Sequence, residues 1–302
     1  MKNKNMMYHM MALLTISIWG TTFVFTKILL EVFSPVEIML YRFVITYVTL
    51  MVIHPRFHKI SLKDEGLFVL LGIFGGSLYF LTENIALHLT PASNVGFLLA
   101  TAPIFTALLA HLFTKDEKMS KNIWIGFVIA MLGVFLVMFN GNFILKLSPL
   151  GDILSIAAAL SWALYTILLK KLDTQYTPIY TTRKVYFYAI LTIIPVFLAS
   201  GYTVELHKFM DIAVTANLLF LGLAASALGF ILWNIAVKHL GAVKTNNYIY
   251  LNPVITLIGA VWVLHERLTL YSALGSVLIL AGVYLSQHKK TKTIAINETI
   301  EV

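Results

Sequence analysis

The sequence predicts an all-α integral membrane protein with ten transmembrane helices arranged as two inverted repeats of five helices each. Three observations predict this fold: the composition, the number of apolar segments and an internal similarity. Of the 302 residues, 59% are hydrophobic and only 12% are charged, and the mean hydropathy is +0.84. A soluble domain carries about 25% charged residues. We therefore expect the chain to lie in a bilayer.

Ten segments are apolar over the roughly 20 residues that a helix needs to cross a bilayer. The first segment continues too far for a signal peptide and lacks a small-residue cleavage pattern, so we interpret it as a retained helix. The polar stretches between the segments are too short for a soluble domain. The predicted helices cover residues 10–30, 34–53, 66–88, 91–113, 121–139, 150–170, 178–199, 215–238, 241–264 and 269–287.

Lysine and arginine are distributed unevenly between the loops at the two ends of these segments. With a cytoplasmic N-terminus, the outer loops contain only Lys146, Lys208 and Arg267. The inner segments contain Lys2, Lys4, Arg56, Lys59, Lys63, Lys115, Lys118, Lys121, Lys170, Lys171, Lys238, Lys289, Lys290 and Lys292. Cytoplasmic loops carry the excess of these residues. We therefore expect a multi-pass plasma membrane protein with both termini in the cytoplasm.

The two halves of the chain resemble each other. Similar residues recur in the same order at shifts of 143 to 150 residues, and loop insertions account for the change in the shift. The matched pairs include Trp19 with Trp162, Lys27 with Lys170, Ser34-Pro35 with Thr177-Pro178, Phe80 with Phe230, Asn84 with Asn234, Pro103 with Pro253, Thr106 with Thr256, Glu117 with Glu266, Gly126 with Gly275 and Gly133 with Gly282. We expect one repeat at 10–139, a second at 150–287 and a cytoplasmic tail at 288–302.

Five helices are an odd number, so the second repeat begins on the opposite side of the membrane. Inverted repeats place a binding site near the middle of the bilayer, and rocking of the halves exposes that site to each side in turn. The repeat therefore predicts a secondary transporter that works by alternating access.

The residues that carry the repeat resemble the EamA-type branch of the drug/metabolite transporter superfamily. They are Trp19-Gly20 with Lys27, Pro35 with Arg42, the stretch from Ala92 to Pro103, the stretch from Glu117 to Gly133 and its second copy from Glu266 to Gly282. This resemblance implies ten helices, export of small metabolites or drugs, and a central cavity formed by helices three, four, eight and nine with one and six. The first copy reads KDEKMS where the second reads LHERLT, so the second keeps the glutamate motif better.

Glu83 lies inside the third predicted helix, in the stretch YFLTENIALHLTP. A charged group at the centre of a membrane helix costs on the order of 2.5–3.5 kcal/mol, and such groups face a cavity or a partner. We expect Glu83 to bind a substrate ammonium group or to take up and release a proton. The alternative is a structural ion pair with Lys27 or Arg42.

Aromatic and amide side chains extend the predicted site. Trp19 and Trp162 are repeat counterparts, with Tyr165 on the face of Trp162, and the ninth segment contains NNYIYLNP before Pro253. The amides could instead form hydrogen bonds between helices, and the aromatic rings could simply pack. Together with Glu83, the predicted substrate-binding residues are Trp19, Tyr79, Asn84, Asn94, Trp162, Tyr165, Asn234, Asn246, Asn247 and Tyr250.

Two further groups of residues have more than one interpretation. Thr15, Thr22 and Thr26 form a stripe with Trp19, which either lines a cavity or bonds to carbonyl groups of its own helix. The cations Arg42, Arg183 and Lys184 inside predicted helices either attract anionic groups, guide closure or extend to the headgroups, and the last explanation is the simplest.

Other functional classes lack their motifs. The chain has no cysteine, and HExxH, GxSxG and GxxxxGK[ST] do not occur in it. We therefore expect no enzymatic activity, catalytic residue, metal or cofactor. No basic run with interleaved aromatic residues suggests nucleic acid. The expected partners are a small-molecule substrate, such as an amino acid or a drug, and lipid, with the chain a monomer or a loose homodimer. The alternatives are an uncoupled channel or facilitator and a membrane-bound enzyme.

Overall fold

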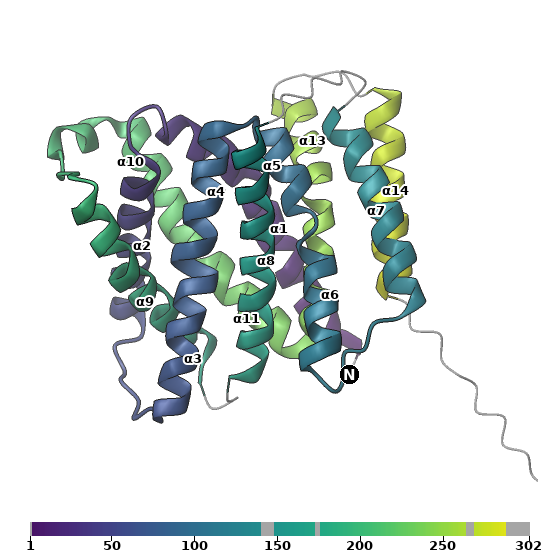
Figure 1. Ribbon diagram of the computed structural model, residues 1–302, viewed down its shortest axis with the longest axis horizontal. Helices are drawn as coiled ribbons and strands as arrows, with labels where there is room; N and C mark the ends of the chain where they lie inside the picture. The colour runs from purple at the N-terminus through teal and green to yellow at the C-terminus, as the bar shows by residue number, and fades with distance from the viewer. Residues whose placement is uncertain (1, 140–147, 173–175, 264–268, 288–302) are drawn as a thin grey trace, which may run out of the picture.

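The computed structural model describes residues 2–139, 148–172, 176–263 and 269–287, and in these ranges the regular structure is entirely helical. Most helices run along a common axis and form a bundle (Figure 1). The all-α prediction is therefore confirmed for this part of the chain. The elements are α1 (Lys2–Leu29), α2 (Pro35–Ile53), α3 (Leu62–Gly72), η1 (Ile73–Ser77), α4 (Leu78–Leu89), α5 (Ala92–Leu99), α6 (Ala102–Phe113), α7 (Lys121–Phe139), α8 (Pro149–Lys171), α9 (Pro178–Ala199), η2 (Leu206–Met210), α10 (Ile212–Leu219), η3 (Phe220–Leu228), α11 (Gly229–Leu240), α12 (Ala242–Asn246), η4 (Asn247–Leu251), α13 (Asn252–Val263) and α14 (Leu270–Gln287).

Nine helical segments in the described ranges are long and apolar enough to cross a membrane. They correspond to nine of the ten predicted helices. The remaining prediction, 241–264, falls on α12, η4 and α13, which are three short elements, and its last residue lies outside the described ranges. A total of ten spans therefore stays a prediction.

Helices α2 and α9 begin in the same way because their first residues follow the same pattern. Ser34 caps α2: its hydroxyl accepts a hydrogen bond from the backbone N–H of Glu37, and the Glu37 carboxylate accepts one from the N–H of Ser34. Thr177 caps α9 through its hydroxyl group. Pro35 and Pro178 occupy the first helical position, where the missing N–H costs nothing.

Irregular turns occur at places that the repeat makes equivalent. The π-helical turns η1 and η3 interrupt the third and eighth predicted helices. Before Pro103, regular helix is interrupted at Ala100 and Thr101, and before Pro253 the 3₁₀-helix η4 separates α12 from α13. Proline lacks a backbone N–H and clashes with the preceding turn. These two breaks follow directly from prolines that the sequence places in matching positions.

The helix pairings place both halves around a shared centre. α1 packs against α11 and α13, α8 packs against α4, α5 and α6, and α2 packs against α9. At one edge of the bundle, on the right of Figure 1, α7 packs along α14. There Gly126 faces Gly282 and Gly133 faces Gly275, and a Cβ atom on any of them would lie 2.5–2.6 Å from the facing carbonyl oxygen. Glycine permits this close helix approach.

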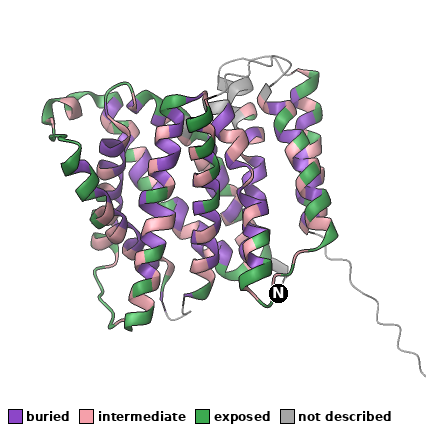
Figure 2. Ribbon diagram, in the orientation of Figure 1, coloured by how far each residue is buried: buried purple, intermediate pink, exposed green. Residues whose placement is uncertain are grey.

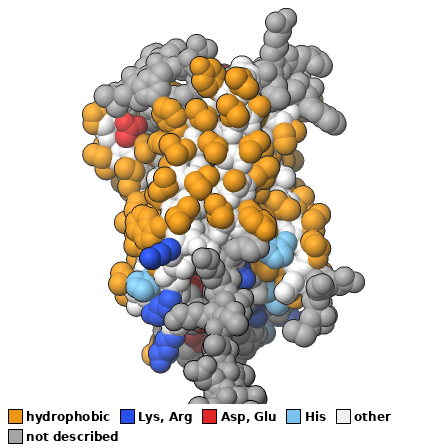
Figure 3. All heavy atoms as spheres, turned by 90° about the vertical axis from the view of Figure 1, so that its right-hand side faces the viewer, with side chains coloured by type: hydrophobic (Ala, Val, Ile, Leu, Met, Phe, Trp, Pro, Cys, Tyr) orange, Lys and Arg blue, Asp and Glu red, His pale blue; other side chains and the backbone are white. Residues whose placement is uncertain are grey.

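The outward surface is apolar, as expected for a bundle surrounded by lipid. Buried residues concentrate in the interior of the bundle (Figure 2). Along the edge formed by α7 and α14, hydrophobic side chains such as Val128, Leu132, Val277 and Leu280 are exposed. Figure 3 shows this apolar face, with lysine and arginine side chains gathered below it. The arrangement is typical of a multi-pass membrane protein.

Candidate functional site

Two cavities lie at opposite ends of the bundle. The larger, of about 560 Å³, contains Glu83 in its wall and is called the Glu83 cavity. The smaller, of about 470 Å³, contains Glu117 and is called the Glu117 cavity. The Glu117 cavity lies at the end that carries the N-terminus, among the ends of α8, α11 and α14. The Glu83 cavity involves the second half of α1 and lies toward the other end.

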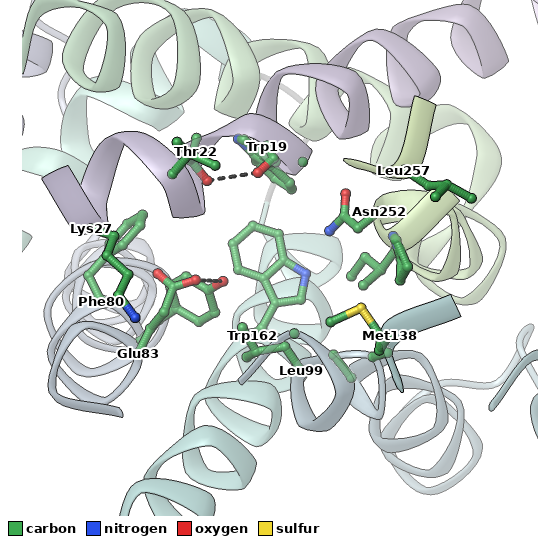
Figure 4. Close-up of a pocket in the computed structure, with 18 of the residues that line it drawn as sticks. Trp19, Thr22, Lys27, Phe80, Glu83, Leu99, Met138, Trp162, Asn252 and Leu257 are labelled. Atoms are coloured by element: carbon green, nitrogen blue, oxygen red, sulfur yellow. Dashed lines mark hydrogen bonds between the residues drawn. The ribbon is translucent and has the colours of Figure 1, made fainter. Parts of the chain in front are cut away.

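The Glu83 cavity is enclosed by helices from both halves of the chain. Residues of α1, α2, α4, α5, α6, α7, α8, α11, η4 and α13 form its wall. Most of the wall is apolar or aromatic, as in cavities for small organic molecules. In Figure 4, Trp162 occupies the centre of the view, and Trp19, Glu83, Asn252 and Met138 surround it from different helices.

An aromatic cluster lies at the Glu83 cavity: Trp19, Trp162 and Phe230 line its wall, and none of the rings of the cluster lines the Glu117 cavity. The ring centroids of Trp19 and Trp162 are 5.1 Å apart, and Trp162 lies 5.6 Å from Phe230 and 5.8 Å from Trp233. Tyr165 lies 5.1 Å from Trp162 on the same helix. Rings at these separations attract each other beyond simple burial. We call Trp19, Trp162, Tyr165, Phe230 and Trp233 the aromatic barrier.

A polar chain lies behind the aromatic barrier, on the side of the Glu117 cavity. The Tyr165 hydroxyl donates to Asn234 Oδ1 at 2.7 Å, and Asn234 Nδ2 donates to Thr182 Oγ1 at 3.0 Å. Asn234 also lines the Glu117 cavity. The chain therefore links α8, α11 and α9 through fully used amide atoms, and it connects the barrier to the second cavity.

The two buried charged groups of the Glu83 cavity, Glu83 and Arg42, are held by neutral partners. The Tyr79 hydroxyl donates to Glu83 Oε1 at 3.0 Å, and Glu83 is only 8% exposed. Arg42 is 4% exposed, its Nε donates to Ser226 Oγ at 2.5 Å, and its guanidinium carbon lies 4.2 Å from the ring centroid of Phe80. Among the described residues neither Glu83 nor Arg42 forms an ion pair. The alternative interpretation of Glu83, a structural ion pair with Lys27 or Arg42, therefore finds no support in the described part of the chain.

Glu117 has a complete set of partners. Its Oε1 lies 2.8 Å from Lys170 Nζ and accepts from the backbone N–H of Ala242 at 2.9 Å. Its Oε2 accepts from the N–H of Val243 at 2.8 Å. Gly241, with φ of +94°, allows the turn before α12 to approach the carboxylate. We call Glu117, Lys170, Ala242 and Val243 the Glu117 clamp, because it joins the loop before α7, the end of α8 and the start of α12.

The structure brings part of the predicted site together. Trp19, Tyr79, Glu83 and Trp162 line the Glu83 cavity, and Tyr165 and Asn234 lie behind its floor. The other predicted residues are buried but do not line either cavity: Asn84, Asn94, Asn246, Asn247 and Tyr250. Asn94 on α5 donates to Thr90, the residue that caps the end of α4, and Asn246 donates to the carbonyl of Ala242 on its own helix. A role of these residues in binding stays a prediction.

The threonine stripe of the first helix and the cations Arg183 and Lys184 each have more than one interpretation, and the structure answers them differently. Thr15 and Thr22 donate to carbonyl groups of their own helix, and Thr22 also lines the Glu83 cavity. Arg183 donates to the carbonyl groups of His54 and Arg56 at the end of α2, and Lys184 pairs with Glu65 at 2.6 Å. These two cations therefore hold helix ends together.

The sequence analysis missed several residues of the Glu83 cavity. Arg42 was assigned mainly to the headgroup region, but it lies in the cavity wall. Phe80 and Phe230 also line the cavity, and their match in the repeat was the available signal. Asn252 lines it as well, next to Pro253 in the polar stretch of the ninth segment.

Comparison with known proteins agrees with this architecture. The model of the EamA-like transporter family matches the chain twice, over residues 6–139 and 149–287. An uncharacterized transporter of Archaeoglobus fulgidus is 30% identical over 289 residues, which are 93% of this chain and 98% of that protein. A probable amino-acid metabolite efflux pump of Escherichia coli is 29% identical, over 91% of this chain and 93% of the relative.

Solved structures share the fold. One crystal structure superposes with a TM-score of 0.72 over 94% of this chain and 96% of the other, at 16% sequence identity. This match concerns the fold alone. The double family match and the full-length relatives confirm the resemblance in the sequence, and the chain belongs to the EamA-like transporter family.

Proposed function

We propose that this transporter exports a small amphipathic metabolite, such as an amino acid or a related compound, by alternating access. Two relatives support the substrate class, because the proteins of Escherichia coli and Salmonella typhimurium are named probable amino-acid metabolite efflux pumps. The observation that carries the mechanism is the pair of cavities at opposite ends of the bundle, divided by the aromatic barrier. A continuous pore would not need such a division.

Alternating access needs two halves that can exchange roles, and the helix pairings support this. If the repeats are inverted, the contact of α1 with α11 corresponds to the contact of α8 with α4, and both occur. The pairs α2 with α9 and α7 with α14 correspond to themselves, and the matched turns η1 and η3 correspond to each other. We infer two inverted five-helix units, with both termini in the cytoplasm and the Glu83 cavity facing outward.

In this arrangement the Glu117 clamp closes the cytoplasmic end. The carboxylate ties three chain segments with charge-assisted hydrogen bonds, which are stronger than neutral ones. Release of the clamp would let solvent and substrate reach the polar chain behind the aromatic barrier. The barrier would then have to open toward only one end at a time.

The chain offers a clean test because it contains no cysteine. Ile28 lines the Glu83 cavity and is 41% exposed, whereas Val237 lines the Glu117 cavity and is 1% exposed. Single-cysteine variants Ile28→Cys and Val237→Cys are labelled in proteoliposomes with a membrane-impermeant thiol reagent. We expect strong labelling at residue 28 and weak labelling at residue 237. When a transported solute is loaded inside the vesicles, labelling should fall at residue 28 and rise at residue 237.

Transport is measured in the same proteoliposomes as counterflow of a mixture of the proteinogenic amino acids, followed by mass spectrometry. A carrier accelerates uptake when the same compound is loaded inside, and a channel does not. Counterflow without reciprocal labelling, or simultaneous labelling of both cysteines, would reject alternating access. For the orientation, cysteines in place of Lys121 and Lys208 must react from opposite sides, and reaction from one side would reject the inverted arrangement.

A further inference from the structure

Two opposite charges lie in the wall of the Glu83 cavity without neutralising each other directly. Arg42 comes from α2 and Glu83 from α4, and both side chains are more than nine-tenths buried. Both side chains line the same cavity, but within the described part of the chain they do not form an ion pair. Each charge instead has one neutral hydrogen-bonding partner: Ser226 for Arg42 and Tyr79 for Glu83.

Such a pair of charges is costly unless something compensates for it. Burying a charge away from water is unfavourable, and a charge inside a membrane protein normally has a counter-charge or faces water. Here each side chain is fixed by its neutral neighbour, and the Phe80 ring supports the guanidinium from one side. The two charges are therefore oriented in the cavity and remain available to a solute.

The chemistry of the two groups defines that solute. The planar guanidinium group binds a carboxylate through two parallel hydrogen bonds. A carboxylate accepts hydrogen bonds from an ammonium group. The rest of the wall is mostly apolar and aromatic, with Trp19, Trp162 and Leu99 among its residues, and Lys27 and Glu31 also line it. We propose that Arg42 and Glu83 together select solutes that carry both a carboxylate and an ammonium group on a compact apolar body. This inference depends on the proposed function, since it assigns recognition to the same cavity.

A solute with only one charge binds more weakly for a physical reason. An amine without a carboxylate neutralises Glu83 but displaces water from Arg42 without replacing its interactions. A carboxylate without an amine neutralises Arg42 but displaces water from Glu83 without replacing its interactions. Leaving a buried charged group without partners is more unfavourable than leaving a neutral group without them. We therefore expect at least a tenfold preference for a zwitterion over either singly charged analogue.

Three compounds with the same branched carbon skeleton test this preference. They are L-leucine, 3-methylbutylamine, which lacks the carboxylate, and 4-methylpentanoate, which lacks the amine. L-Methionine and L-phenylalanine, each with its decarboxylated and deaminated analogues, extend the series. Binding to the purified full-length chain is followed by intrinsic fluorescence, because Trp19 and Trp162 lie in the cavity wall. We expect the zwitterion of at least one series to bind at least tenfold more tightly than its two analogues.

Substitutions of the two charges test the assignment of each group. Arg42→Gln should weaken zwitterion binding at least tenfold and leave the amine unchanged, and Glu83→Gln should weaken zwitterion binding and leave the carboxylate unchanged. Arg42→Lys keeps the charge but not the planar guanidinium group. Its affinity for the zwitterion should lie between those of the unsubstituted protein and Arg42→Gln. The matched control is Arg183→Gln, a buried arginine outside both cavities. It should change thermal unfolding but not the order of the three compounds.

Each other outcome rejects the inference. Tightest binding by the amines, tightest binding by the carboxylates, or binding of no compound in any series excludes zwitterion selection. Equal loss of all three ligands in a folded Arg42→Gln protein would make Arg42 a structural residue. If the ligand order contradicts zwitterion selection but Ile28→Cys and Val237→Cys are labelled reciprocally, the proposal of alternating access still stands. If the ligands bind in the expected order but both cysteines are labelled simultaneously, the carrier mechanism is rejected and the recognition site still stands.

Discussion

The Glu83 cavity and the Glu117 cavity each contain a carboxylate, and the two carboxylates differ in their partners. Glu117 binds Lys170 and two backbone N–H groups, so its negative charge is fully compensated. Glu83 accepts a hydrogen bond from Tyr79 and pairs with no cation among the described residues. A compensated carboxylate holds chain segments together, whereas an uncompensated one in a cavity can bind a ligand. Under the proposed mechanism, Glu117 closes one end of the bundle and Glu83 recognises the solute at the other.

The repeat makes the difference more informative. Lys170 in the Glu117 clamp corresponds to Lys27, which lines the Glu83 cavity and is exposed. Glu266, the counterpart of Glu117, lies outside the described residues. Two equivalent lysines thus stand in different surroundings in one conformation, one in a salt bridge and one in a cavity wall. Unequal surroundings of equivalent residues are what an alternating mechanism requires of any single state.

The largest expected effect comes from removing the division between the cavities. Trp162 contacts Trp19, Phe230 and Trp233, so Trp162→Ala removes the centre of the aromatic barrier. We expect a loss of about 3–5 kcal/mol in the free energy of unfolding, as for other buried large-to-small changes. The cavities should also become continuous, so that Ile28→Cys and Val237→Cys are both labelled without solute. Trp162→Phe is the control and should restore most of the protection at residue 237.

A smaller effect is expected from the Glu117 clamp. Glu117→Ala removes the ion pair with Lys170 and leaves the N–H groups of Ala242 and Val243 without their acceptor. Hydrogen bonds to charged groups contribute about 1.5–3 kcal/mol each. We expect the closed population to fall enough that labelling of Val237→Cys from the cytoplasmic side rises at least tenfold. Asp116→Ala is the matched control, because Asp116 also contacts Lys170 but its side chain is 67% exposed. Equal labelling in both variants would contradict a closing role for Glu117.

How far the sequence predicts the molecule differs between its elements. Hydropathy predicts the nine long helical segments, because exposure to lipid constrains every residue on the outside of a helix. The prolines predict the breaks before Pro103 and Pro253, because a missing N–H acts locally. The π-helical turns η1 and η3 have no comparable signal. They depend on packing, such as the contact of Gly75 with the ring of Tyr165, which only the folded chain defines.

The site was predictable where the residue type itself is costly in a membrane. Glu83 was found for this reason, and Trp19 and Trp162 were found through the repeat. Asn84 is predicted as the repeat counterpart of Asn234, but it lies next to Glu83 on the helix, where adjacent residues point in different directions, and it does not line the cavity. Asn246 bonds within its own helix and Asn94 bonds to Thr90 at the end of the preceding helix, and composition cannot distinguish such bonds from ligand binding. The position of Arg42 in the cavity wall could not be predicted, because it depends on the depth of α2 in the membrane relative to α4. Hydropathy alone does not determine that depth.

The smallest expected effect separates backbone strain from the clamp itself. Gly241 and Gly201 both have positive φ, at +94° and +68°. A Cβ atom at Gly241 would overlap the Glu117 carboxylate, whereas a Cβ atom at Gly201 would meet nothing within 4 Å. Both alanine variants place a Cβ atom on backbone with positive φ, which strains an L-residue by on the order of 1–2 kcal/mol. Only Gly241→Ala must also displace Glu117.

We therefore expect both variants to unfold at a lower temperature, with Gly241→Ala affected more. Labelling of Val237→Cys should rise a few-fold in Gly241→Ala and stay unchanged in Gly201→Ala. The two measurements together are decisive because strain alone would lower stability in both proteins without opening the Glu117 cavity. Equal labelling in the two variants would mean that the turn at Gly241 tolerates displacement of Glu117. In that case closure of this end would depend on the aromatic barrier and not on the carboxylate.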